Sequence, residues 1–175
     1  RRTTGRATGW LSYTLSKSDR KFSKDSGVNG GERFPFTYDR RHNVNMVANW
    51  KMTKGIDLDA TWSFYSGATA TISLQSGYEM TPESIGESSY VSSRNNYRLP
   101  PTHLLCLGIN FRKTLKRGVE RIWNVSVYNA YNAMNPNFIL RKTDEYGREM
   151  PNKLSKYTLL PCLPSLYPAL QDKMR

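Results

Sequence analysis

The chain has 175 residues and a formal net charge of +12, so it is the length of one ordinary domain and strongly basic. It contains no apolar run of about 18 residues and no signal-peptide pattern, which excludes a helical membrane span. Its many Tyr, Asn, Ser and Thr residues are typical of strands and turns. The chain starts at Arg1 and Arg2 without an initiator Met, and we expect it to be a fragment or a processed piece.

The basic residues gather mainly in predicted turns, at residues 17–24, 40–41, 51–54 and 112–121. A nucleic-acid partner would suit the charge, but the chain has no zinc-finger spacing, no RNP-like aromatic motif and no basic helix. Anionic lipid headgroups at a membrane surface explain basic turns as well. We therefore predict a membrane partner and no nucleic acid.

Five segments show alternating apolar and polar side chains, which is the period of a β-strand with two unlike faces. They lie at residues 10–16, 43–52, 56–65, 104–112 and 123–128. A sixth, less regular segment starts at about Lys156 and ends the chain. Long connections at 17–38, 66–101 and 133–155 alternate with short turns at 53–55 and 113–120. A small hairpin is predicted within the third long connection, around residues 144–148.

The apolar face of the five alternating segments carries no Asp, Glu, Lys or Arg. Three tryptophans lie on it near strand ends, where aromatic side chains form girdles at membrane interfaces: Trp50, Trp62 and Trp123. The other face carries amides, hydroxyls and a few charges. We expect it to line a wet lumen through Asn43, Asn45, Asn49, Asp57, Asp59, Asn110, Ser126 and Tyr128.

These features predict an all-β fold, an antiparallel transmembrane β-barrel segment of about six strands. Its short turns would be periplasmic and its long loops extracellular. The alternative is a soluble or secreted all-β binding module, because a sandwich also alternates and would bury the same faces against each other.

Five ordered motifs cover nearly the whole chain. They are residues 9–16 (GWLSYTLS), 38–42 (YDRRH), 65–67 (YSG), 97–103 (YRLPPTH) and 128–136 (YNAYNAMNP). In order and spacing they resemble the closing part of TonB-dependent outer-membrane receptors of the Bacteroidetes type. The resemblance marks these family-motif positions: Asp39, Arg40, Arg41, His42, Tyr128, Asn129, Asn132 and Pro136.

The resemblance implies a barrel of about 22 strands, of which residues 1–175 would be the C-terminal part. The implied function is TonB-energised nutrient uptake across the bacterial outer membrane, with no enzymatic activity and no cofactor. The implied partners are outer-membrane lipid and lipopolysaccharide, the rest of the barrel and its plug domain. TonB would act indirectly through that plug, which lies outside this chain.

The chain departs from the family pattern at three places. Leu104 and Cys106 stand where the family usually has Arg and Asp, so a polar pair of the lumen is lost. The chain ends on Arg175 and not on an aromatic residue. Pro168 lies inside the expected last strand, and proline lacks the N–H that a ladder needs, so we expect an uncertain register there.

Two histidines and two aspartates are candidates for a metal site or a catalytic site. His42 and His103 have no second ligand nearby in sequence, so we expect no metal. Asp57 and Asp59 share a face; a catalytic carboxylate pair is possible, but lumen carboxylates near Lys51 are favoured.

Cys106 and Cys162 form no metal motif and no disulfide framework, and we expect free structural thiols. The chain also lacks a Gly-x-Ser-x-Gly elbow and a phosphate-binding loop, so nothing in it indicates catalysis.

The motif residues also have structural interpretations. For Arg40 and Arg41 we favour the holding of loop carboxylates over contact with anionic lipopolysaccharide. The Tyr-Asn box at 128–132 is expected to pin the change from strand to loop through side-chain-to-backbone hydrogen bonds. The second long connection supplies candidates for cargo contact: Tyr78, Tyr90 and Tyr97.

Overall fold

The computed structural model describes residues 1–72, 75–81, 84–90, 93–115, 119–136, 138–143, 145–146, 149–158 and 160–172. These residues form strands and two short 3-10 segments, η1 (Lys24–Ser26) and η2 (Val28–Gly31), and contain no α-helix. The predicted all-β fold is therefore confirmed. In the described part of the chain no helix is long and apolar enough to cross a bilayer.

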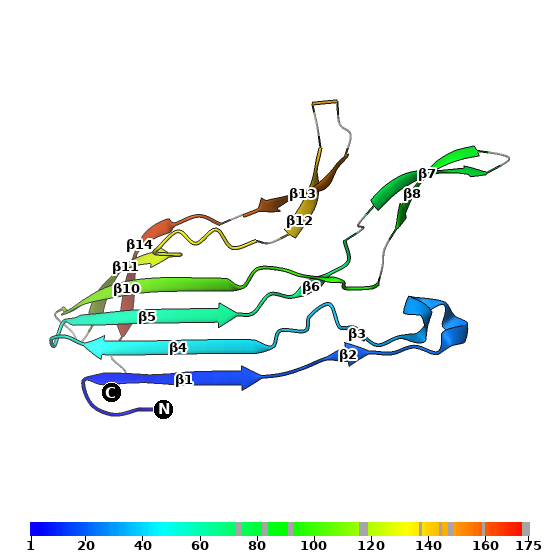
Figure 1. The fold of residues 1–175 in the computed structure, drawn as a ribbon. Coiled ribbons are helices and arrows are strands. Elements are labelled where there is room, and N and C mark those ends of the chain that lie inside the picture. Colours follow the sequence, from blue (N-terminus) through cyan, green and yellow to red (C-terminus); the bar gives the residue numbers. More distant parts are fainter. Residues whose placement is uncertain are drawn as a thin grey trace.

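One six-stranded antiparallel sheet dominates the fold, with the order β1-β4-β5-β10-β11-β14. Figure 1 shows that it curves, so that β11 and β14 lie farther from the viewer than β1 to β10. β1 and β14 are the two end strands of this order. The strand bounds are Ala7–Leu15 (β1), His42–Lys51 (β4), Ile56–Tyr65 (β5), Thr102–Thr114 (β10), Val119–Tyr128 (β11) and Leu163–Asp172 (β14).

The alternating pattern located the first five of these strands, and β5 has the predicted bounds. The start of the sixth was predicted wrongly. Lys156 belongs to β13 (Glu149–Tyr157), and the sheet strand begins only at Leu163. The prolines at 161, 164 and 168 interrupt the alternation of apolar and polar residues there, so the alternation does not mark where β14 begins.

The three long connections leave the sheet at one end, and the short turns lie at the other (Figure 1). Within the long connections four small two-stranded sheets form, and β12–β13 brackets the predicted hairpin position. The pairs are β2 (Asp19–Arg20) with β3 (Phe34–Pro35), β6 (Thr69–Ala70) with β9 (Tyr97–Arg98), β7 (Gln75–Thr81) with β8 (Ser84–Tyr90), and β12 (Phe138–Thr143) with β13.

The register aligns the apolar side chains of each strand with those of the next across all six strands. One row of paired residues runs Gly9, Ala48, Ala60, Leu107, Val127 and Pro164. The next runs Ala7, Trp50, Leu58, Ile109, Val125 and Leu166. Because side chains alternate along each strand, these rows define one continuous apolar face and the intervening rows a polar face.

The last strand keeps this register through both of its prolines. β11 and β14 pair without a shift from Val119 opposite Asp172 to Tyr128 opposite Leu163. Proline cannot donate, so Pro164 and Pro168 must occupy positions whose missing N–H faces away from β11. The expected uncertainty of register at Pro168 is therefore not seen, because β14 is an end strand whose outer edge has no ladder partner among the described residues.

The described chain has almost no hydrophobic core. Phe34 and Ala133 are its buried hydrophobic residues, and both lie outside the six-stranded sheet. Large apolar side chains on the sheet stay exposed, among them Leu11 at 66%, Trp50 at 51% and Leu166 at 63%. No second layer covers the apolar face within the described residues, which is unusual for a sheet of this size.

Candidate functional site

The apolar face carries the three predicted interface tryptophans at two levels. Trp50 lies opposite Leu58, and Trp123 lies between Phe111 and Pro168, both near the short turns. Trp62 lies in the half of β5 nearer the long connections, where its indole N–H donates to the Tyr131 hydroxyl at 3.2 Å. The aromatic side chains thus flank a central band of aliphatic ones, while their contact with a membrane interface stays a prediction.

The polar face is crossed by hydrogen bonds between neighbouring strands. The Tyr65 hydroxyl donates to the Asn45 amide oxygen at 2.8 Å, and the Ser126 and Ser165 hydroxyls are 2.7 Å apart. All eight predicted lumen-lining residues belong to strands and lie on this face, and whether they line a lumen stays a prediction.

Asp57 and Asp59, which share the polar face with Glu120, have structural partners. Asp57 forms an ion pair with Arg112, whose Nε lies 2.6 Å from the carboxylate oxygen. The register places Lys51 opposite Asp57, but the ion pair is with the arginine of β10. Asp59 accepts a hydrogen bond from the Asn110 amide, which itself accepts from Asn124 at 2.7 Å. These pairs explain both carboxylates without catalysis.

Leu104 and Cys106 occupy the polar face opposite Ser63 and Thr61, where the family resemblance implies a charged pair. Cys106 is half-buried and Cys162 is exposed, and both are free thiols. The hydroxyl groups of Ser63 and Thr61 therefore lie beside an aliphatic side chain and a thiol. This part of the polar face is less polar than the part around Asp57.

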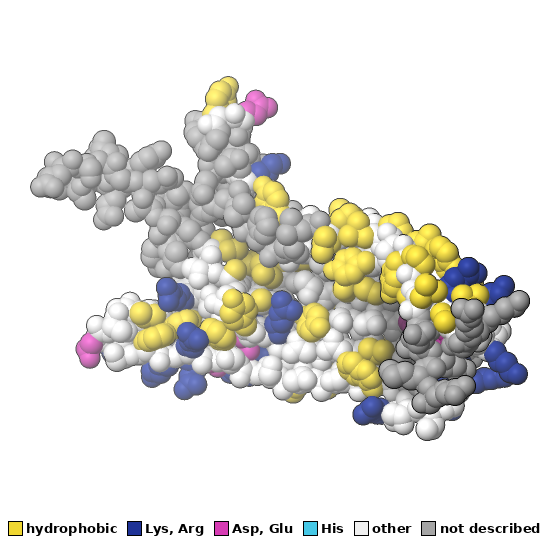
Figure 2. Space-filling view, turned by 180° about the vertical axis from the view of Figure 1, so that it is seen from behind, with side chains coloured by type: hydrophobic (Ala, Val, Ile, Leu, Met, Phe, Trp, Pro, Cys, Tyr) yellow, Lys and Arg dark blue, Asp and Glu magenta, His cyan; other side chains and the backbone are white. Residues whose placement is uncertain are grey.

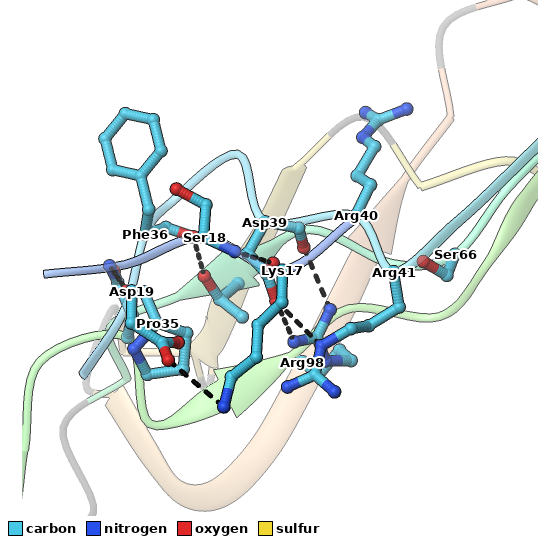
Figure 3. A network of polar contacts seen from close by, with 12 residues as sticks. Lys17, Ser18, Asp19, Pro35, Phe36, Asp39, Arg40, Arg41, Ser66 and Arg98 are labelled. Carbon is cyan, nitrogen blue, oxygen red and sulfur yellow. Dashed lines mark hydrogen bonds and ion pairs between the residues drawn. The ribbon is translucent and has the colours of Figure 1, made fainter. Parts of the chain in front are cut away.

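A buried carboxylate joins three of the sequence motifs at the end of the sheet where the long connections leave (Figure 3). Asp39 is 1% exposed. Its Oδ1 accepts from the Ser18 backbone N–H at 2.7 Å, and its Oδ2 accepts from Arg98 Nη2 at 2.6 Å and Arg41 Nε at 3.4 Å. The YDRRH and YRLPPTH motifs, about 60 residues apart in sequence, therefore meet in one ion-pair cluster.

Two opposing effects act on the Asp39 carboxyl. Burial raises its pKa, while the hydrogen bonds from Arg98, the Ser18 N–H and Arg41 lower it. The net effect is a pKa below the usual value, so this carboxylate is ionised at neutral pH. Arg41 holds a carboxylate of its own loop, which agrees with the favoured structural role.

The third motif enters the cluster through its glycine. Arg98 Nη1 donates to the backbone carbonyls of Asp39 and Gly67, each at 2.9 Å. At Gly67 a Cβ would lie 1.6 Å from the Leu99 carbonyl oxygen. The close approach of these two backbones needs glycine, and it brings the Tyr65-Ser66-Gly67 turn within reach of Arg98.

The Tyr-Asn box fixes the start of the third long connection. Asn129 is 1% exposed, and its amide accepts from the Ala133 N–H at 2.7 Å and donates to the Ala133 and Leu160 carbonyls at 3.1 Å. Asn132 accepts from the Cys162 N–H at 3.0 Å. Both asparagines have a φ of +53°, which Asn tolerates better than most residues. The predicted side-chain-to-backbone bonds are confirmed.

The two histidines each pair with a tyrosine hydroxyl. His42 Nδ1 lies 2.9 Å from the Tyr13 hydroxyl, and His103 Nδ1 lies 2.8 Å from the Tyr131 hydroxyl. Asn135 also forms two bonds with the His103 backbone, at 2.9 and 2.6 Å. In the described part of the chain no group of three His, Cys, Asp or Glu side chains is placed to hold a metal.

A cavity of about 350 Å³ lies between the motifs at this end of the sheet. Its walls include Tyr38, Arg40, Ser66, Gly67 and Pro136. Arg40 does not share the Asp39 carboxylate; its guanidinium carbon lies 5.2 Å from the Tyr65 ring centroid, a cation–π distance. Most of the lining is apolar and includes Ala68, Leu99 and Pro100, and the polar part consists of hydroxyl groups and the Arg40 guanidinium.

Ser18, Asp39, Arg41, Gly67 and Arg98 form a junction between the first and second long connections. Some residues of this junction were not predicted from the sequence. Arg98 was quoted within a motif but not singled out, although it is the one cation of that motif and makes three of the bonds to Asp39 and Gly67. Asn95, 9% exposed, donates to the Pro35 carbonyl at 2.7 Å and was also missed. Of the cargo candidates, Tyr97 is 36% exposed in β9, and the side chains of Tyr78 and Tyr90 lie outside the described ones.

Comparisons with protein-family models, with curated proteins and with solved structures found no match for this chain.

Proposed function

We propose that this chain forms part of the wall and long loops of a TonB-dependent outer-membrane receptor, a β-barrel that takes up nutrients. The six strands are its C-terminal strands, the short turns are periplasmic and the long connections are extracellular. The plug and the remaining strands belong to the rest of the receptor.

One observation carries the proposal. The apolar face runs in register over six strands, and no side chain in its two central rows is charged. None of those side chains is buried in the described part of the chain, and seven of the twelve are exposed. In water such a face costs about 25 cal/mol for each Å² left uncovered, whereas lipid tails cover it without a second protein layer.

The polar face supports the same reading. Several of its carboxylates, amides and hydroxyls are paired across strands, and a polar face opposite an apolar one is what a wall between water and lipid needs. The alternative, a soluble or secreted binding module, requires another surface to cover the apolar face.

A matched pair of lysine substitutions tests the proposal. Ala48 and Asn49 are adjacent exposed residues of β4 that point to opposite faces. Ala48→Lys places a charge in the central apolar row, which costs about 2–4 kcal/mol at mid-depth in a membrane. Asn49→Lys adds the same charge to the polar face.

We expect Ala48→Lys to lower incorporation into lipid vesicles at least tenfold, and Asn49→Lys to leave it near the wild-type level, measured by flotation. Equal incorporation of both variants would contradict the proposal. So would a wild-type chain that stays monodisperse and melts cooperatively in buffer without detergent.

A further inference from the structure

Two basic side chains lie side by side at the short-turn end of the apolar face. Lys113 of β10 is the direct cross-strand partner of Arg121 of β11. They follow the Phe111–Trp123 pair in the same alternation, so both belong to the face that carries those aromatic rings. The apolar face therefore ends, on these two strands, in a pair of cations.

This pair is unfavourable without a counter-charge. Like charges directly opposite each other on antiparallel strands destabilise the pairing. The described ion pairs include neither residue. Glu120 precedes Arg121 in β11 and belongs to the opposite face, and Asp172 of β14 lies diagonal to Arg121 on the same face, with its side chain outside the described ones. Arg121 Nε is also buried and has no hydrogen-bond partner, which leaves a donor unsatisfied.

The surroundings indicate what would satisfy these donors. Trp123 is 39% exposed and Phe111 41% exposed directly beside the pair, and Leu170, opposite Arg121 on β14, is 71% exposed. Lys and Arg side chains gather at this end of the molecule, at the right of Figure 2. A ligand for this place needs an anionic oxygen for the two cations and an apolar tail for the rings.

We propose that Lys113 and Arg121 bind the phosphate of an anionic phospholipid whose acyl chains lie against Phe111 and Trp123. Guanidinium and ammonium groups are strong donors to phosphate oxygens, and one phosphate between them removes their mutual repulsion. A net-negative lipid is preferred over a zwitterionic one, because a choline or ethanolamine group brings a third cation to the site. This inference rests on the proposed function, since it needs the apolar face to meet a bilayer.

The test uses Trp123 as its reporter. In a chain with the other three tryptophans replaced by Phe, Trp123 fluorescence is measured in vesicles that contain brominated phosphatidylglycerol or brominated phosphatidylcholine at equal mole fraction. We expect the anionic lipid to quench more strongly, with a local enrichment on the order of tenfold. A chain that keeps only Trp62, which lies toward the other end of the sheet, should show no such preference.

Substitutions assign the preference to the pair. Lys113→Gln with Arg121→Gln should abolish it, and the charge-preserving Lys113→Arg with Arg121→Lys should retain it. The matched control is Lys21→Gln with Arg33→Gln, which removes the same charges from exposed positions in the first long connection. Retention of the preference in the Gln pair, or its loss in the matched control, would overturn the proposal.

Three further outcomes distinguish an error in the phospholipid assignment from an error in the proposed function. Equal quenching of Trp123 by both lipids overturns the phospholipid site but leaves the proposed function intact. Absence of quenching by either lipid in a chain that floats with the vesicles shows that Trp123 does not meet acyl chains, and it overturns the proposed function itself. If the chain in phospholipid-free detergent binds inorganic phosphate through the pair and added phosphatidylglycerol does not displace it, the site takes free phosphate, and the lipid assignment is wrong.

Discussion

Asp39 shows how a single residue ties the junction together. Its carboxylate is fully enclosed, and it is stable there because two guanidinium groups and one backbone N–H surround it. An ion enclosed in this way is costly to leave unpaired. The side chain therefore acts as a structural tie between the first and second long connections, not as a catalytic group.

We predict that Asp39→Asn weakens this tie. The amide keeps the shape but loses the charge that Arg98 and Arg41 need, at a cost of about 2 kcal/mol. Amide hydrogen exchange at Ser18, whose N–H donates to Asp39, should accelerate by a factor of about 30 at neutral pH. Asp25→Asn, an exposed carboxylate of η1, is the control and should change nothing.

The lowered pKa of Asp39 also predicts how the tie depends on pH. A carboxyl whose pKa is lower in the folded chain stabilises the fold above its usual range near pH 4, and that contribution is lost as the pH falls through the lowered value. Acid unfolding of the long connections, followed by near-UV circular dichroism, should depend less on pH in Asp39→Asn. An unchanged acid transition would contradict this assignment.

Gly67 supports a second prediction at this scale. Gly67→Ala forces its Cβ against the Leu99 carbonyl, so the two backbones must separate and Arg98 loses a carbonyl partner. We expect a loss of several kcal/mol in thermal or denaturant unfolding. At Gly108 a Cβ meets its nearest neighbour at 3.7 Å, an ordinary contact, so Gly108→Ala should cost far less. Equal effects of the two changes would argue against the close approach.

The pairing of β14 with β11 depends on the positions of the prolines in β14. Pro164 and Pro168 both face their missing N–H away from β11, so the donors of the intervening odd-numbered residues face β11. The outer edge of β14 therefore offers fewer N–H donors than a proline-free strand would, while its carbonyl groups remain available for pairing. Such an edge resists unwanted pairing with other strands.

Moving a proline by one residue should therefore detach the strand. We predict that Ala169→Pro, in a chain where Pro168→Ala restores the donor count, removes a bond to Ile122 and raises amide exchange along the C-terminal half of β14. Pro168→Ala alone should leave the pairing with β11 intact. Detachment in both variants would show that the prolines are oriented differently.

For the whole molecule, the open order of strands has a direct consequence. β1 and β14 end the sheet, and the apolar face is uncovered within the described residues. We predict that the isolated chain aggregates in buffer and needs detergent to stay dispersed, as judged by light scattering. A stable closed barrel formed by this chain alone would contradict its proposed place in a larger wall.

Much of the sheet was predictable because strand alternation is a local property. In β5, Ile56 to Phe64 and Asp57 to Tyr65 sort onto two faces by spacing alone, and the structure keeps that sorting. Among the six strands of the sheet, only β14 was not correctly located, since its prolines interrupt the alternation of apolar and polar side chains. The Tyr-Asn box was predictable for the same reason, because Asn129 bonds to Ala133, four residues away.

The junction, by contrast, was decided by tertiary structure. Nothing near Asp39 in sequence indicates that Arg98 is its main partner, because that contact depends on how two long connections return to the same end of the sheet. The cation pair of Lys113 and Arg121 likewise appears only once the β10–β11 register is known. The strands and their two faces follow from local sequence, since these depend on neighbours two residues apart. The fold decided which charges meet, since that depends on register and loop closure between residues far apart in the chain.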